Sequence, residues 1–429
     1  MVLKKEKDGW VYEDQRLHMQ CTIPAACEVS MLQTPDIPEL REQEKIEQEI
    51  RSPGSGKTLT ELVKEKKAKT VSILVSDATR AVPTAKLAFA VVKELQENQI
   101  ALQDITFFVA IGVHRPATEA ECQEILGKLY GKVRIENHTP FDKENLLYLG
   151  DTKRGTPIYV NQRAYECDLH IQIGKVEPHE FAGFSGGRKS VLPGIAGEET
   201  IQINHRPEMI LDPKAGIGIL EGNPVHEDML EAAEMFRIDF SVNCILNNTL
   251  QLSAVYAGTL KECHEQAVQY VKEILGVPFK KPDILITTPG LPLDIDFYQA
   301  VKALIALTEV LEESTTVILY CGCKEGINSP DMLSAFCSDE SLENVVAYTE
   351  EHYKIQMDHV LLLSKILRKH VRIFVVCPNI KKEDVGEMFM FPFDSLQEAV
   401  DEAIRSSERK DPDILIYPRP QTGLPEKTD

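Results

Sequence analysis

The sequence lacks the features that mark several common classes of protein. It contains no run of about 18 apolar residues, so we expect no membrane-spanning helix. No apolar segment follows the lysines of its first ten residues, "MVLKKEKDGW", so we expect no signal peptide. Its 47 basic residues are outnumbered by 67 acidic ones, for a formal net charge of -20, whereas nucleic acids and anionic membranes require a basic surface. We therefore expect a cytoplasmic protein that binds neither nucleic acid nor a membrane.

The ten cysteines include no CxxC pair, the spacing most typical of zinc and redox sites. Only Cys321 and Cys323 are close in the sequence, as CxC. Scattered cysteines in a chain of this length predict reduced, mostly buried thiols in a cytosolic enzyme. A metal site is the alternative that the pattern leaves open.

At 429 residues the chain exceeds the usual size of one hydrophobic core, so we expect two domains. In its first part, short apolar runs alternate with segments of helical periodicity, which predicts strand–loop–helix units and a parallel sheet. The expected strands are 70–76, 105–112 and 168–176, and the expected helices are 84–98 and 117–131.

A second α/β unit is expected after the proline-bracketed segment "GVPFKKPD". Its expected strands are 284–290, 315–322, 371–378 and 413–420, with a helix over 298–313. The predicted fold is α/β, with two domains that each have a largely parallel sheet flanked by helices. The predicted boundaries are an N-terminal domain (1–275), a linker (276–282), a C-terminal domain (283–420) and a loose tail (421–429).

The segment "RSPGSGKT" (51–58) resembles a phosphate-binding P-loop only at its end. The P-loop pattern requires glycine at its first position, where this chain has Arg51, and a buried strand before it. A charged amphipathic segment, "ELREQEKIEQEI", precedes it instead. We interpret 51–58 as a turn after a helix.

Ligands of parallel α/β sheets bind beyond the carboxyl ends of the strands. Three loops of the first domain occupy such positions: "DATRAVP" (77–83), "GVHRPAT" (112–118) and the loop that begins "PHEFAGFSGGRKSVLPGIAG" (178–197). We expect the candidate functional residues in these loops.

The first two loops offer a carboxylate, a guanidinium and an imidazole. Asp77 is either a helix cap or a functional acid. The forked donors of Arg80 suit a carboxylate or a phosphate. His114 follows the neighbouring strand, where Asp77 could bind one of its ring nitrogens and so fix the tautomer of the other.

The third loop carries the most reactive groups. Its glycines allow backbone amides to approach an anion, and His179 lies in its opening turn. Lys189 could be a phosphate counter-ion, a Schiff-base amine or a covalent cofactor anchor. No acidic residue precedes Glu198 in the neutral stretch around it, which argues against an ordinary surface salt bridge. His205 could be a metal ligand.

In the second domain, Tyr298, Gln299 and Lys302 lie at the start of the expected helix 298–313. Tyr298 and Lys302 are four residues apart, so they share one helix face, and a helix start favours an anion such as a substrate carboxylate. An ordinary surface lysine is the alternative. Two histidine bases in one site would suit inversion of a stereocentre, although spacing does not prove it.

Five segments in order and spacing resemble the motifs of the nickel-pincer lactate racemases, a family of 2-hydroxy acid racemases and epimerases. They are "DATRAVP", "GVHRPAT", "PHEFAGFSGGRKSVLPGIAGEETIQINH", "GNPVHEDMLEAA" and "PLDIDFYQAVKA". They span residues 77–303, weaker similarity reaches both ends of the chain, and the long GFSGGRK segment is a specific signature.

The resemblance implies a cofactor that spacing does not reveal. This is the nickel-pincer nucleotide, a pyridinium-3,5-bisthiocarboxylic acid mononucleotide that carries nickel, and it is held covalently as a thioamide by a lysine at the position of Lys189. A histidine matching His205 completes the coordination of nickel. We expect further cofactor contacts in the same loops, from Thr79, Ser185, Gly186, Gly187 and Arg188.

The resemblance also implies catalytic roles, with the cofactor on the first domain and the active site in the cleft between the domains. Histidines matching His114 and His179 act as alternate bases on the substrate hydroxyl, while hydride leaves the α-carbon for the cofactor and returns to its other face. A residue matching Asp77 supports the base. The residues that match those holding the carboxylate and the developing ketone are Arg80, Tyr298, Gln299 and Lys302.

Two departures from the family pattern concern the substrate. Family members carry a tryptophan near the substrate in the second domain, whereas the one tryptophan here is Trp10. The segment "CGCKEGINSPDM" (321–332) has Ile-Asn where lactate-specific relatives tend to have His-Gly. The resemblance therefore implies a 2-hydroxy acid that is lactate-like or a larger or acidic relative.

Two alternatives to a racemase follow from the same residues. An NAD-type hydroxy-acid dehydrogenase would need GxGxxG after a strand, and "GFSGGRK" does not fit that pattern. A non-enzymatic nickel-nucleotide binding protein would need Lys189 and His205 but not two bases. The expected partners are a small 2-hydroxy acid and the enzymes of cofactor biosynthesis, in a monomer or homodimer.

Overall fold

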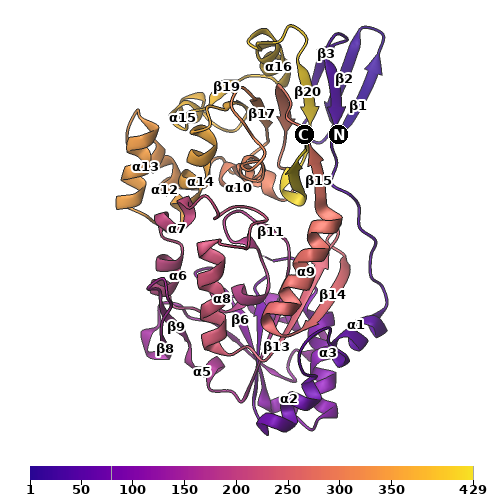
Figure 1. Cartoon of the computed structure of the whole chain (residues 1–429), viewed down its shortest axis with the longest axis vertical. Coiled ribbons are helices and arrows are strands. Elements are labelled where there is room, and N and C mark those ends of the chain that lie inside the picture. Colours follow the sequence, from indigo (N-terminus) through magenta and orange to yellow (C-terminus); the bar gives the residue numbers. More distant parts are fainter. Residues whose placement is uncertain (79, 429) are drawn as a thin grey trace. The chain divides into compact units, whose positions relative to one another are not determined.

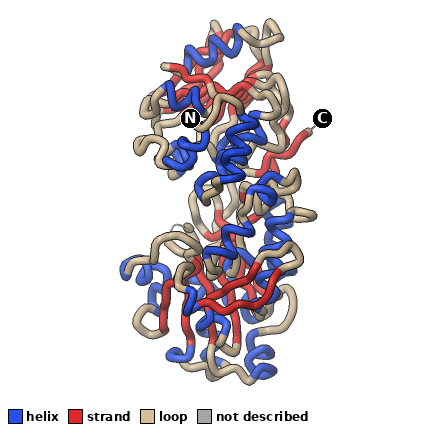
Figure 2. Tube along the Cα trace, turned by 90° about the vertical axis from the view of Figure 1, so that its left-hand side faces the viewer, coloured by secondary structure: helices blue, strands red, loops and turns tan. Residues whose placement is uncertain are grey.

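Two parallel-rich sheets organise the chain. The computed structural model describes residues 1–78 and 80–428, so the predicted cofactor contact Thr79 lies outside the described residues. The chain divides into a central unit, of residues 36–205 and 218–274, and a terminal unit, of residues 1–35, 206–217 and 275–429 (Figure 1). In each unit, strands are grouped with helices around them (Figure 2). The predicted α/β fold class is confirmed.

The central sheet has the strand order β14-β13-β10-β5-β6-β7 and is parallel except for the β13–β14 pair. Its strands are β5 (Val71–Ser76), β6 (Ile105–Ala110), β7 (Arg134–Asn137), β10 (Leu169–Lys175), β13 (Phe240–Leu246) and β14 (Leu252–Gly258). Its helices are α1 (Gln43–Arg51), α2 (Leu59–Lys66), α3 (Thr84–Glu97), α4 (Glu119–Leu126), α5 (Gln162–Tyr165), α6 (Glu198–Asn204), α8 (Pro224–Phe236) and α9 (Leu260–Leu275). A hairpin is formed by β8 (Leu146–Asp151) and β9 (Pro157–Asn161).

The two faces of the central sheet differ in chemistry because side chains alternate along a strand. On β5 and β10, Ile73 and Ile171 belong to the large apolar cluster that also contains residues of helices α1 to α4. The alternate positions of β10 and β13 carry buried polar side chains, including Gln172 and Asn243. Buried polar groups need hydrogen-bond partners. Gln172 and Asn243 find theirs in the loop that follows β10.

The order of the central strands places the three candidate loops together. Strand β5 lies between β6 and β10. The chain places β6 on one side of β5 first and β10 on the other side later. Such a reversal of strand order creates a crevice at the carboxyl ends, where ligands of open α/β sheets bind. The loops after β5, β6 and β10 are the three that carry Asp77, His114 and Lys189.

The terminal sheet is parallel throughout, with the order β19-β18-β17-β16-β20-β4. Its strands are β4 (Glu28–Met31), β16 (Ile284–Thr287), β17 (Thr316–Tyr320), β18 (Arg372–Val376), β19 (Phe391–Phe393) and β20 (Asp413–Ile416). Its helices are α7 (Pro207–Leu211), α10 (Phe297–Ala300), α11 (Lys302–Ile305), α12 (Pro330–Phe336), α13 (Leu342–Glu351), α14 (Asp358–Leu367), α15 (Lys382–Glu387) and α16 (Leu396–Arg405).

The division into units differs from the predicted boundaries because pairings between distant segments override chain order. The meander β1 (Val2–Glu6), β2 (Gly9–Asp14) and β3 (Met19–Pro24) belongs to the terminal unit rather than to an N-terminal domain. There Tyr12 and Tyr320 share a buried hydrogen bond between their hydroxyl groups of 2.6 Å. Local periodicity carries no information about such contacts.

The segments predicted as a linker and a loose tail pair with each other. Strand β15 (Gly276–Phe279) lies in the predicted linker 276–282, and β21 (Leu424–Lys427) lies in the predicted tail 421–429. They form a parallel pair over four residue positions. Residues 206–217 also belong to the terminal unit, where Lys365 donates to the carbonyls of Asp212 and Ala215.

The helix predicted over 298–313 is divided. The structure has the short helices α10 and α11, followed by turns. Here backbone hydrogen bonds to the fourth preceding residue alternate with bonds to the third preceding residue, such as the one from the Leu304 N–H to the Val301 carbonyl. Bonds of the second kind belong to the tighter 3-10 helix and interrupt the α-helix. The segment 51–58 is the predicted interhelical turn, and Thr58 caps α2. In the described part of the chain, no helix is both long and apolar enough to cross a bilayer.

Candidate active site

The structure brings Asp77 and His114 into contact. Asp77 follows β5 and His114 follows β6, and the His114 Nδ1 lies 2.7 Å from the Asp77 Oδ2. The carboxylate is buried, whereas the imidazole is 46% exposed. Because a carboxylate accepts hydrogen bonds, Nδ1 carries the proton and the Nε2 lone pair of His114 is available as a base.

The loop that carries Lys189 is fixed to the polar face of the central sheet. The Gly187 N–H donates to the Asn243 Oδ1 at 3.0 Å, and the Ser190 hydroxyl donates to the Gln172 Oε1 at 3.2 Å. The loop after β6 joins it, because the Gly112 N–H donates to the Gly194 carbonyl at 2.9 Å. Hydrogen bonds from the sheet and from the neighbouring loop thus hold the backbone on both sides of Lys189.

Lys189, His179 and His205 gather around one aromatic ring. The Lys189 Nζ lies 3.1 Å from the His179 Nε2 and 5.8 Å from the centre of the Phe181 ring. The rings of His179 and His205 each meet Phe181 edge to face, with centroid distances of 4.8 and 5.2 Å. An amine and two imidazoles therefore share one neighbourhood, as the sequence predicted for this loop.

His205 has the protonation state of a metal ligand. It is buried, and burial together with the positive charge of Lys189 lowers its pKa to about 3. Its Nδ1 lies 3.0 Å from the Ile201 carbonyl and must donate to it, so Nε2 keeps its lone pair. A neutral imidazole whose second nitrogen is held by a carbonyl is the usual arrangement of a ligating histidine.

The other predicted cofactor contacts in this loop are engaged within the protein. The Ser185 hydroxyl donates to the Lys175 carbonyl at 2.7 Å, and the Gly187 N–H is taken by Asn243. Arg188 is 1% exposed, and its Nη2 donates to two loop carbonyls at 2.8 Å each. For Ser185, Gly187 and Arg188 these contacts favour a role in shaping the loop, and contact with a cofactor stays a prediction.

The glycines of the loop are required by close packing. At Gly186, a Cβ would lie 2.7 Å from the Val176 Cγ2 and 3.0 Å from the Lys175 carbonyl oxygen. At Gly183, where φ is 75°, a Cβ would lie 2.2 Å from the carbonyl oxygen of Ile219. The glycine pattern therefore reflects the approach of backbone to backbone as much as any approach to an anion.

We expect the substitution Gly183→Ala to lower the free energy of unfolding by about 3 kcal/mol, because it combines left-handed backbone strain with a backbone clash. The matched control is Gly155→Ala, since Gly155 has the same φ of 75° but a Cβ there would meet no heavy atom within 4 Å. That change should cost about 1 kcal/mol. Denaturant unfolding of the full chain measures both, and equal losses would contradict the packing argument.

Three predicted substrate-binding residues lie in the terminal unit, in α10 and α11. The Tyr298 hydroxyl donates to the Asp358 carboxylate at 3.1 Å, and its ring stacks on His359 at a centroid distance of 4.0 Å. Gln299 and Lys302 are half-buried. The first helix turn is capped by Asp296, whose Oδ1 accepts from the Gln299 N–H at 2.7 Å. A substrate carboxylate at this helix start would therefore compete with Asp296, which weakens the helix-start argument.

Arg80 is exposed in the loop after β5, and its backbone N–H donates to the Asp77 carbonyl at 3.2 Å. This position, next to the Asp77–His114 pair, is compatible with the predicted contact to a substrate carboxylate. Its role stays a prediction.

Sequence reasoning missed the residues that position Lys189. Phe181 separates the two imidazoles, and Asn243 and Gln172 anchor the loop. The signal for the last two was present, because polar residues that alternate with apolar ones in a strand buried on both faces demand partners. Which loop would supply those partners depended on the sheet order.

Two family models match the chain. The lactate racemase N-terminal domain matches residues 12–218, and the lactate racemase C-terminal domain matches residues 277–420. A lactate racemase of Thermoanaerobacterium thermosaccharolyticum is 30% identical over 371 residues, which cover 84% of this chain and 85% of that protein. A lactate racemase of Lactiplantibacillus plantarum is 36% identical over 289 residues, which cover 67% of this chain and 68% of that protein.

Solved structures agree with these matches. The lactate racemase apoprotein from T. thermosaccharolyticum superposes with a TM-score of 0.85 at 28% identity, covering 96% of this chain and 97% of that chain. A Thermotoga maritima protein reaches a TM-score of 0.66 at 19% identity, covering 91% of this chain and 100% of that chain, and this likeness concerns the fold alone.

Proposed function

This chain belongs to the lactate racemase family, and we propose that it interconverts the two enantiomers of a 2-hydroxy acid with the help of a nickel-pincer nucleotide held by Lys189. The family assignment makes it an isomerase. The observation that carries the finer proposal is the grouping of Lys189, His179 and His205 around Phe181.

The residues of this group fit the proposed cofactor. Lys189 offers an amine on a loop that is fixed to the sheet, as a covalent anchor requires. His205 offers a neutral, buried nitrogen donor that borderline metal ions such as nickel accept. When bound, this cofactor would supply an electrophilic centre that can take hydride from the α-carbon, chemistry for which protein side chains have no group.

The side chains of the chain itself would move the proton of the substrate hydroxyl. His114 would accept it at Nε2, and the Asp77 carboxylate at Nδ1 would stabilise the imidazolium that forms. His179 would perform the same step for the opposite enantiomer. Acylation of the Lys189 amine would remove a cation from beside the His179 Nε2 and so make protonation of that imidazole easier.

Residues of the terminal unit would recognise the substrate side chain. The segment with Ile327 and Asn328, which departs from lactate-specific relatives, adjoins the predicted substrate-binding helix: the Tyr298 N–H donates to the Ile327 carbonyl at 3.1 Å. The Asn328 amide donates to Asp296, the cap of the same helix, at 3.0 Å. We propose that this segment adapts the site to lactate or to a larger or acidic 2-hydroxy acid.

The dehydrogenase alternative gains no support from the loop after β10. A dinucleotide site would need a glycine turn that opens a long helix. This loop instead leads into a short 3-10 helix (Gly187–Ser190), and the Gly187 amide is taken by Asn243.

The proposal is tested with protein produced together with the cofactor-synthesising enzymes and incubated with 2-deuterated hydroxy acids, without NAD. We expect racemisation with the deuterium retained on the α-carbon, because hydride that returns from an acceptor does not exchange with water. Lactate, malate and longer 2-hydroxy acids should be compared. Loss of the deuterium to solvent, or a requirement for added NAD, would refute the proposed mechanism.

A further inference from the structure

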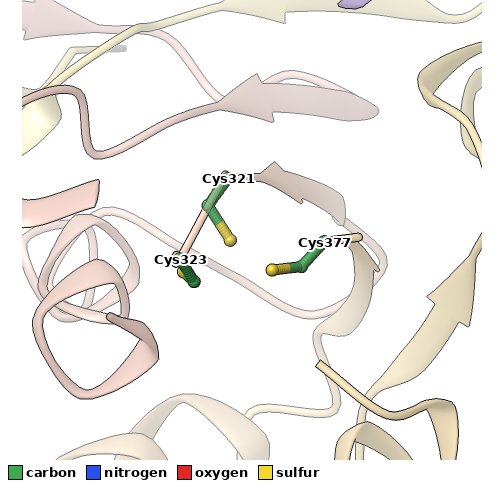
Figure 3. A group of neighbouring side chains, drawn as sticks. All are labelled: Cys321, Cys323 and Cys377. Carbon is green, nitrogen blue, oxygen red and sulfur yellow. The ribbon is translucent and has the colours of Figure 1, made fainter. Parts of the chain in front are cut away.

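Three cysteines of the terminal unit meet at the carboxyl edge of its sheet (Figure 3). Cys321 and Cys323 follow β17, and Cys377 directly follows β18. These strands are parallel neighbours, and their last paired residues are Tyr320 and Val376. The Cys321 N–H donates to the Val376 carbonyl at 3.0 Å, which continues the pairing. Cys321 and Cys377 are therefore placed side by side by the sheet itself.

The spacing of the three sulfur atoms suits a single metal ion. Their Sγ atoms all lie within 4.8 Å of one another. A point between them is then within about 2.8 Å of every sulfur, compared with about 2.3 Å for a zinc–sulfur bond, so small side-chain shifts would complete the coordination. Figure 3 shows the side chains of Cys321 and Cys377 directed toward each other from the two strands. A disulfide would use two of these sulfurs and leave the third.

The loops that carry the cysteines are fixed by bonds unrelated to sulfur. The Cys323 N–H donates to the Asp294 carbonyl at 3.1 Å, and the Gly322 N–H donates to the Asp294 carboxylate at 2.6 Å. The Asn379 side chain donates to the Gly322 carbonyl at 2.7 Å and ties the two loops together. Cys323 has a φ of 43°, a left-handed conformation that a side chain rarely adopts. The structure thus holds the cluster together at some conformational cost.

The three sulfur atoms are largely removed from solvent. Cys321 and Cys323 are fully buried, and Cys377 is half-buried.

We propose that Cys321, Cys323 and Cys377 together bind one thiophilic metal ion of the zinc(II) class. Three soft sulfur donors select such ions over magnesium or calcium, and they leave one position of a tetrahedral ion for a non-protein ligand. The site lies in the terminal unit, whereas Lys189 and His205 lie in the central unit. It does not depend on the proposed racemase chemistry.

The test uses the full chain, reduced, freed of metal and kept under nitrogen, with cobalt(II) as the spectroscopic probe. One equivalent of cobalt(II) should produce a near-ultraviolet sulfur-to-metal charge-transfer band, and one equivalent of zinc(II) should abolish it. Because histidine gives no such band, cobalt bound elsewhere is distinguished. Zinc should also raise the melting temperature, since an ion that binds only the folded state stabilises it.

Variants locate the site. Cys377→Ser should lose the band and the zinc-dependent rise in melting temperature, and Cys321→Ser should do the same. Cys337→Ser is the matched control, because Cys337 is an exposed free thiol of the same unit, and it should keep both signals. If Cys321→Ser does not fold, the result for Cys377→Ser alone tests the proposal, because Cys377 is only half-buried. The proposal is overturned if wild-type protein gives no thiolate band, if Cys377→Ser keeps the band, or if the cysteines form only a disulfide and the reduced protein binds no ion.

Discussion

The replacement Lys189→Arg is expected to abolish racemisation, with a loss of at least about 10³-fold in rate, because in the proposed mechanism catalysis depends on a covalently held electron acceptor. Arginine keeps the positive charge beside His179 but cannot form a thioamide, so the change separates anchoring from electrostatics. The measurement is the racemisation rate together with the intact mass of protein that is produced with the cofactor-synthesising enzymes. The wild type should carry the cofactor mass, and the variant should not.

The matched control for this prediction is Lys175→Arg. Lys175 lies at the end of β10, just before the same loop, where its ammonium pairs with Glu177 at 2.6 Å. Arginine can keep that ion pair, so we expect a normal cofactor mass and a rate within about twofold of the wild type. Active wild-type protein with an unmodified Lys189 would contradict the anchoring role, whatever the rate of the variant.

The second large effect is expected from the two proposed bases. His114→Gln and His179→Gln should each lower the racemisation rate by about 10²- to 10⁴-fold, the usual contribution of a general base. The loss in kcat/KM should be equal in the two directions, because the enantiomers have equal free energy and the enzyme cannot change that equilibrium. Rates measured from each pure enantiomer test this, with His18→Gln, a change of an exposed histidine in the terminal unit, as the control. A variant that retains full activity would show that its histidine is not a base.

A double-mutant cycle distinguishes the positioning role of Asp77 from a role of its own. Asn in place of Asp77 can still meet His114 but no longer stabilises the imidazolium, so Asp77→Asn should lower the rate by at least about tenfold. Combined with His114→Gln, it should add little further loss, because the two residues act as one unit. Multiplicative losses would mean that Asp77 acts separately, and restoration by Asp77→Glu would support the positioning role.

The contact between Asp77 and His114 was predictable because both residues lie in loops that follow neighbouring strands. Parallel strands end at the same sheet edge, so the loops after β5 and β6 had to meet. The grouping of Lys189 with two histidines was predictable only in outline. Its geometry depends on Phe181 and on the anchoring of the loop by Asn243, which lies 56 residues from its partner Gly187 in the chain.

The cysteine cluster shows the limit of sequence spacing. Cys321 and Cys323 form a CxC pair that is visible in the sequence, but the third sulfur comes from Cys377, at the end of the next strand of the sheet. Nothing in the local sequence joins position 377 to position 321, because sheet pairing is set by hydrophobic contacts over the whole unit. The helix-start argument for Tyr298 weakened for a similar reason, since the capping role of Asp296 depends on local geometry that periodicity does not report.

By itself the sequence determined the α/β class, the positions of seven strands of the two main sheets and the chemical types available at their ends, because alternation and helical periodicity are local properties. The tertiary structure alone decided which distant segments share a unit. It joined residues 1–35 to the C-terminal sheet, paired the supposed linker with the supposed tail, and gave the Lys189 loop its anchors. These outcomes depend on contacts between residues far apart in the chain. Such contacts form only when the whole unit folds, so a local stretch of sequence does not reveal them.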